Sequence, residues 1–299
     1  MKSSKYIVTI IFSIFMIITF IIGIIKFNFW KENSIKDTIK EVEVCKSYKN
    51  NYNSDLHKKY CENLISSNDE NLNLAYFDVM TYVEDFMPLS SNFILIFFVV
   101  ISSTYYISKY LKNNILSNDL TRQSYKKIKT KLLICSWLPA LVIPIISIFK
   151  LIVFYVMTKN FDYSASVIMW QESSLSNVGL FFISYILISL FDSLIYSNIS
   201  LIVIRKKHNF ILSSLLSYLV IIGVELFLEI VVNMLICTNI FHSEIGVVFN
   251  IINFGCFNDS YGIFIPLVVS IVIFFITLII VCLIYKNKEK VIIDCEIND

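Results

Sequence analysis

The sequence has little glycine, little proline and little charge. Only 6 glycines and 4 prolines occur among 299 residues, and 16% of the residues are charged, against about 25% in a typical soluble domain. No glycine falls in a G-x-x-x-x-G-K-[ST] phosphate-binding loop, and the H-E-x-x-H and G-x-S-x-G motifs are also missing. We therefore predict that the chain is not a soluble globular enzyme and carries no ATPase domain of its own.

Histidine and arginine are scarce as well, with three histidines and two arginines in the chain. His57, His208 and His242 all lie in predicted loops or at the edges of apolar runs, whereas an intramembrane metal site needs its ligands inside the spans. No metal site and no cofactor are predicted. The net charge of +2 says nothing about partners, because the charges are segregated by segment, and we expect no nucleic acid.

Long apolar runs are what the sequence has in abundance. Hydrophobic residues make up 57% of the chain, the mean hydropathy is +0.71, and several runs reach the roughly 20 residues that a helix needs to cross a bilayer. Each run satisfies its backbone hydrogen bonds internally only as a helix. We predict one all-α polytopic transmembrane domain over residues 1–299 with six spans, at about 7–26, 87–108, 132–157, 178–204, 210–237 and 263–285. The first run is too long for a signal peptide and lacks a small-residue cleavage site, which indicates an uncleaved anchor.

The charges of the connecting segments alternate. Segments 109–131 and 205–209 are rich in lysine and arginine, whereas 158–177 has one lysine and 238–262 has neither basic residue. The positive-inside rule places both basic segments and both chain termini, including the tail 286–299, in the cytoplasm of a cell-membrane protein.

The most basic segment also has a helical pattern. Apolar residues recur there at mostly helical spacing: Ile115, Leu116, Leu120, Tyr125, Ile128 and Leu132. Ser117 or Asn118 could cap a helix that starts near Asp119 and runs into the third span. Such an amphipathic helix could lie at the membrane face or contact a cytoplasmic partner, and charge bias alone is the simpler alternative.

Residues 115–133, ILSNDLTRQSYKKIKTKLL, resemble the coupling segment of the permease subunits of type 2 ABC transporters. Leu120-Thr121-Arg122 is similar to the first element of that pattern and Lys131-Leu132-Leu133 to the last. The resemblance implies a coupling helix that touches a separate ABC ATPase subunit, and a second permease subunit as partner. The residues expected to take part in ATPase coupling are Leu120, Arg122, Tyr125, Lys126, Lys127, Lys129 and Lys131.

Four ionisable residues fall inside the apolar runs: Lys150, Asp192, Glu225 and Glu229. Each costs roughly 2.5–3.5 kcal/mol or more at the centre of a bilayer, so each is expected to face the protein interior or a watery path. They could line a substrate path or carry protons. They could equally form an interhelical pair, for which Lys150 and Glu229 lie at similar depths, or reach toward the interface.

The outer segments carry four of the cysteines. Cys45 and Cys61 lie in the first outer loop, about 27–86, and Cys237 and Cys256 lie near or in the last. Two disulfides are therefore allowed, although sequence does not fix the pairing. Loop 27–86 could form a small extracytoplasmic subdomain, and the apolar segment 238–262 is predicted to re-enter the outer leaflet, as the resemblance also implies.

Three functions remain open from the sequence. The first is an ABC permease that exports a hydrophobic or amphipathic compound or peptide with energy from a separate ATPase. The second is a proton-coupled secondary transporter that uses the intramembrane acids. The third is a non-transporting immunity or sensor protein that presents the loop 27–86.

Overall fold

The computed structural model describes residues 3–47, 90–112, 115–158, 178–206, 209–228, 230–231, 235, 264–287 and 291. These residues are almost entirely helical, and no strand occurs among them. The chain divides into two compact units, each described by itself. The first comprises Met1–Pro88 with Val153–Val167, and the second comprises Leu89–Ile152 with Ile168–Asp299.

The helices in chain order are α1 (Ser3–Ser47), α4 (Ser90–Lys112), α5 (Ile115–Arg122), α6 (Tyr125–Trp137), the 3-10 turn η1 (Pro139–Leu141), α7 (Val142–Thr158), α8 (Val178–Lys206), α9 (Phe210–Phe227) and α10 (Phe264–Ile284). Pro139 opens η1 and interrupts the run from α6 into α7, because proline lacks the N–H that a continuous helix would use. At its start, α9 is capped by the Asn209 side chain, which accepts from the backbone N–H groups of Ile211 and Leu212.

Among the described residues, five helical stretches are long and apolar enough to cross a membrane, as expected for a multi-pass membrane protein. They are Phe93–Leu111, Tyr125–Val156, Phe182–Arg205, Phe210–Phe227 and Pro266–Ile284. They correspond to the second to sixth predicted spans. The predicted first span, 7–26, lies within α1, whose described apolar stretch is Ile17–Trp30.

In the first unit, α1 extends into the expected outer segment 27–86. Helix α1 continues without a break to Ser47, so residues 27–47 are helical, and the rest of that loop lies outside the described residues. Val42 of this stretch is buried. Cys45 is also buried and is disulfide-bonded, but its predicted partner Cys61 lies outside the described residues, as do Cys237 and Cys256.

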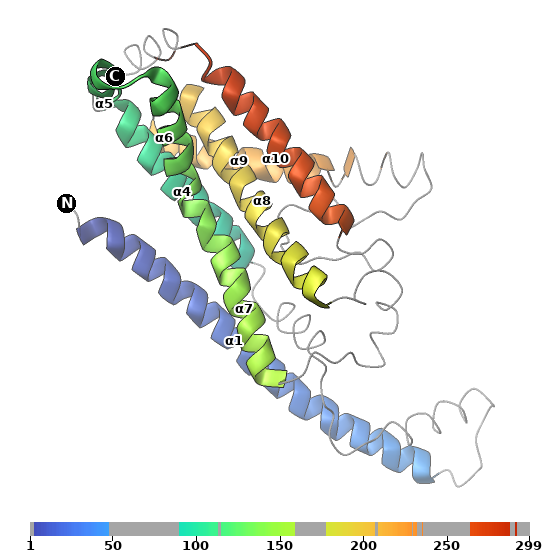
Figure 1. Ribbon diagram of the computed structural model, residues 1–299. Coiled ribbons are helices and arrows are strands. Elements are labelled where there is room, and N and C mark those ends of the chain that lie inside the picture. The colour runs from blue at the N-terminus through green and yellow to red at the C-terminus, as the bar shows by residue number, and fades with distance from the viewer. Residues whose placement is uncertain are drawn as a thin grey trace. The chain divides into compact units, whose positions relative to one another are not determined.

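Helix α8 is the central helix of the second unit. It contacts α10, α4, α9 and α6 (Figure 1), and 72% of its span is buried, compared with 22% of the α10 span. Its sequence explains this position, because its apolar residues are distributed on all sides, and a helix that is apolar all round is typical of a buried one.

Polar side chains join the helices inside this unit. Asn198 of α8 donates to Thr277 Oγ1 of α10 at 3.1 Å and accepts from Trp137 Nε1 of α6 at 2.9 Å. Thr104 of α4 and Ser214 of α9 share a hydrogen bond of 2.6 Å. Such hydrogen bonds are common between membrane helices.

We predict that Asn198→Ala lowers the free energy of unfolding by about 1–3 kcal/mol, because it leaves the buried indole N–H and the Thr277 hydroxyl with one partner fewer. Ser200→Ala is the matched control, since the buried Ser200 hydroxyl bonds only to the carbonyl of Tyr196 in its own helix. Unfolding of both variants in mixed detergent micelles measures the difference. Equal stability of the two variants would contradict the cross-linking role of Asn198.

Candidate functional site

The basic segment folds as two short helices that meet at a sharp break. Helix α5 ends at Arg122 and α6 begins at Tyr125, with Ser124 in an extended conformation (φ −68°, ψ 144°). Two predictions are corrected here. The segment is not a single helix, and Ser117 and Asn118 lie inside α5 rather than capping it, because α5 already begins at Ile115.

An apolar cluster holds the two helices against one end of the bundle. We call it the end cluster. Its buried members are Ile107, Leu111, Leu116, Ile128, Leu132, Leu201, Ile204, Val281, Tyr285 and Val291. They come from α4, α5, α6, α8, α10 and the tail, so segments far apart in sequence converge here. Leu120 and Tyr125 pack against this cluster without being fully buried.

Two polar contacts fasten α6 to the end of α10. Tyr125 Oη donates to the carbonyl of Tyr285 at 2.8 Å, and Lys129 Nζ donates to the carbonyl of Cys282 at 3.1 Å. Carbonyls in the last turn of a helix have no intrahelical donor, and the partial negative charge there favours a cation. A hydrogen bond that involves a charged group contributes about 1.5–3 kcal/mol. Lys129 therefore has an anchoring role in this structure.

A third polar contact ties α6 to α4 and α5. Asp119 accepts from Tyr110 Oη at 2.5 Å and from Lys131 Nζ at 2.9 Å, and the Lys131 ammonium lies 5.2 Å from the centre of the Tyr110 ring. The hydrogen bond from Tyr110, together with Lys131, holds the pKa of Asp119 below its ordinary value. Because the Lys131 side chain is 47% exposed, this pair stabilises less than the α10 contacts do.

The seven predicted coupling residues therefore fall into two groups. Leu120, Tyr125, Lys129 and Lys131 contact the bundle, whereas Arg122, Lys126 and Lys127 are exposed. Lys126 and Lys127 form no side-chain hydrogen bond or ion pair with the described part of the chain. The α5–α6 pair is thus attached to the bundle on one side, which we call its base, through Leu120, Tyr125, Lys129 and Lys131. Its other side exposes the positive charges of Arg122, Lys126 and Lys127, which we call the exposed basic surface.

Two residues that sequence reasoning did not single out complete the base. Tyr285 Oη donates to the carbonyl of Leu201 at 3.1 Å, and the Arg205 guanidinium lies 6.0 Å from the centre of the Tyr285 ring. The sequence analysis placed Arg205 in a cytoplasmic turn, but it is 4% exposed and belongs to α8. A lone tyrosine after the last span gives no signal of this role.

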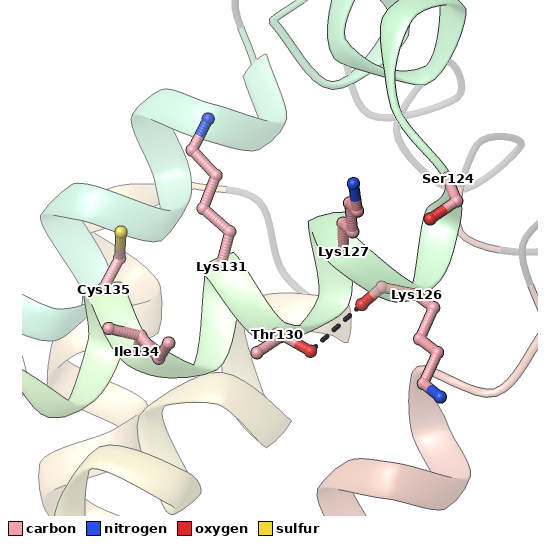
Figure 2. A pocket seen from close by; sticks show the side chains of 7 residues that line it. All are labelled: Ser124, Lys126, Lys127, Thr130, Lys131, Ile134 and Cys135. Carbon is pink, nitrogen blue, oxygen red and sulfur yellow. Dashed lines mark hydrogen bonds between the residues drawn. The ribbon is translucent and has the colours of Figure 1, made fainter.

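The outward side of α6 carries a shallow depression of about 590 Å³. It is lined by Ser124, Lys126, Lys127, Thr130, Lys131, Ile134 and Cys135. Figure 2 shows Lys127 and Lys131 extending to the same side of the helix, and the Thr130 hydroxyl donating to the carbonyl of Lys126. Cys135 is a free thiol, as is Cys282.

Of the four predicted intramembrane residues, the structure describes Lys150, Asp192 and Glu225. Asp192 is fully buried in α8, close enough to Glu225 of α9 and Ser270 of α10 to interact with both. Neither Asp192 oxygen meets hydrogen-bond geometry with a described group. Lys150 is half-buried in α7, and Glu229 lies outside the described residues, so the Lys150–Glu229 pair stays a prediction. No group of three metal-ligating side chains occurs within the described ranges.

Comparison of the chain with protein-family models, with curated proteins and with solved structures finds no match.

Proposed function

We propose that this chain is the permease subunit of an ABC transporter and works with a separate ATPase subunit. The observation that carries the proposal is the α5–α6 pair, which is fastened to α4, α8 and α10 and leaves Arg122, Lys126 and Lys127 exposed. A segment that transmits force needs this combination of a rigid base and an accessible surface. The resemblance of residues 115–133 to a coupling segment supports the same function.

The contacts of the pair suggest how movement would pass to the spans. A partner that displaces α5 pulls on α4 through Asp119 and Tyr110, which are joined by a hydrogen bond. Displacement of α6 pulls on α10 through Tyr125 and Lys129. Because the end cluster is closely packed, the two helices and the bundle end would move together. ATP binding to the partner would supply the displacement.

The distribution of charge supports a cytoplasmic position for this end. Helices α4, α8 and α10 end here and α6 and α9 begin here. The positive-inside rule then assigns the end that gathers the basic residues to the cytoplasm.

The outer surface of the bundle leaves room for a second permease subunit. Only 28% of the α9 span and 22% of the α10 span are buried in a single chain, so both present apolar surface to lipid or protein. We propose a homodimer or a heterodimer, with a hydrophobic or amphipathic substrate.

A second candidate function, proton-coupled transport, is favoured by the proximity of Asp192 and Glu225. Two acids inside a bundle are expensive and are often functional, and no ATPase would then be needed. Nothing in the described residues favours the sensor or immunity function.

We expect Arg122→Glu to weaken association with the ATPase by at least about tenfold, because it reverses the charge of an exposed side chain at the end of α5. The matched control is Lys36→Glu, which reverses the charge of an exposed lysine on α1. Pull-down of the tagged chain from its native membrane, followed by mass spectrometry and an ATPase assay, measures the effect. Arg122→Gln tests whether loss of the charge is enough.

Absence of any ATPase in the wild-type pull-down, under conditions that preserve other membrane complexes, would contradict the first proposal. If the Arg122→Glu variant bound the ATPase as the wild type does, the proposed role of Arg122 in that contact would be contradicted.

For the second candidate, we expect Asp192→Asn to abolish flux that is driven by a proton gradient in reconstituted vesicles, because the amide cannot exchange a proton at neutral pH. The wild type and Ser189→Ala, a change at a buried serine on the same helix, are the references. Flux that depends on ATP and persists in Asp192→Asn would exclude proton coupling through this residue.

A further inference from the structure

The exposed side of the third span changes from basic to apolar along its length. Its first part is the depression on α6, with Lys127, Thr130 and Lys131. It continues as a line of apolar side chains, Ile134, Leu138, Leu141 and Ile145, which are 52%, 57%, 41% and 62% exposed. Their spacing of four, three and four residues is that of one helical face, and the 3-10 turn η1 between α6 and α7 shifts this face locally. We call this line the apolar stripe.

The length of this helical run places the change in character at the membrane boundary. Tyr125–Val156 has 32 residues, which at 1.5 Å each exceed the hydrocarbon thickness of about 30 Å. Residues 132–149 carry no charged side chain, and a helix of that length rises about 27 Å. This rise is close to the hydrocarbon thickness, so Lys131 and Lys150 lie near its two boundaries and the depression lies near the level of the lipid headgroups.

Among the described residues, the positive charge of the depression exceeds the negative charge that faces it. Lys126 and Lys127 are exposed and form no side-chain contact with a described acid, while Lys131 is paired with Asp119. Asp119 is the only acid in segment 109–131. The hydroxyl of Ser124 lines the same depression and makes no capping hydrogen bond. Ammonium and hydroxyl donors in this arrangement suit a phosphate group.

We propose that the depression on α6 and the apolar stripe together bind an anionic phospholipid of the surrounding membrane. The phosphate lies beside Lys127, and one acyl chain runs along Ile134, Leu138 and Leu141. A soluble anion would use the lysines but leave the stripe uncovered. A neutral lipid would cover the stripe but leave the lysines uncompensated. Only an anionic lipid matches both parts of the face.

The proposal depends on membrane insertion and does not depend on an ATPase partner. Lys127 belongs to the exposed basic surface and would face the lipid, whereas Arg122 lies on α5 outside the depression and stays accessible to a cytoplasmic partner. A bound lipid would hold α6 at a fixed depth, and would thereby support the base of the α5–α6 pair.

The test uses the purified full chain in nanodiscs of equal parts phosphatidylcholine and phosphatidylglycerol, without any ATPase. Native mass spectrometry counts the lipids that stay bound. We expect the wild type to retain phosphatidylglycerol in preference to phosphatidylcholine, and Lys127→Gln to weaken its retention about fivefold, as expected for one lysine near an anionic lipid. Arg122→Gln, which removes an exposed charge outside the depression, is expected to retain the lipid as the wild type does.

Thermal unfolding provides a second readout that separates binding from folding. Added phosphatidylglycerol is expected to raise the Tm of the wild type more than that of Lys127→Gln, while the two have the same Tm in neutral lipid. Equal retention of the two lipids by the wild type would overturn the proposal, and so would equal loss of lipid in Lys127→Gln and Arg122→Gln. Thiol labelling of Ile134→Cys and Leu138→Cys gives a third test. Protection of these two positions in a dimer that holds no lipid would show that protein, and not lipid, covers the apolar stripe.

Discussion

The attachment of α6 to the last turn of α10 is the constraint on which the basic end of this protein depends. The carbonyls of Cys282 and Tyr285 lie where the helix provides no donor, and Lys129 and Tyr125 supply one to each. These contacts fix the position of α6 relative to the end of α10 and its rotation about its own axis. With α6 fixed, Lys131 reaches Asp119 and thereby orients α5. Because these contacts orient α5 and α6, they also hold Arg122, Lys126 and Lys127 on the exposed side.

The interior and the exterior of the bundle use different chemistry. Inside, hydrogen bonds such as those of Asn198 connect α8 to its neighbours, since apolar attraction between helices is weak in lipid. Outside, α10 and the apolar stripe present hydrocarbon side chains to whatever surrounds them. Asp192 departs from this scheme because it is buried without hydrogen-bond geometry to a described group.

Hydropathy predicted five of the spans because each is a long, almost uncharged run, and it also predicted the amphipathic character of the basic segment. It missed the break at Ser124, since no proline or glycine marks it. Charge patterning placed Lys129 and Arg205 with the other cations. Only the tertiary structure shows that Lys129 meets a helix terminus and that Arg205 is buried against Tyr285. Contacts between distant segments leave no periodic signal in a single sequence.

Hydrogen–deuterium exchange across residues 115–131 tests the central claim most directly, because it reports whether the α5–α6 pair is held as part of the bundle. In the wild type, the amides of both helices are predicted to exchange as slowly as those at the end of α10. In the double variant Tyr125→Phe and Lys129→Met, they are predicted to exchange at least about tenfold faster, as loss of a charged hydrogen bond implies. Fast exchange in the wild type, or no change in the variant, would contradict the account.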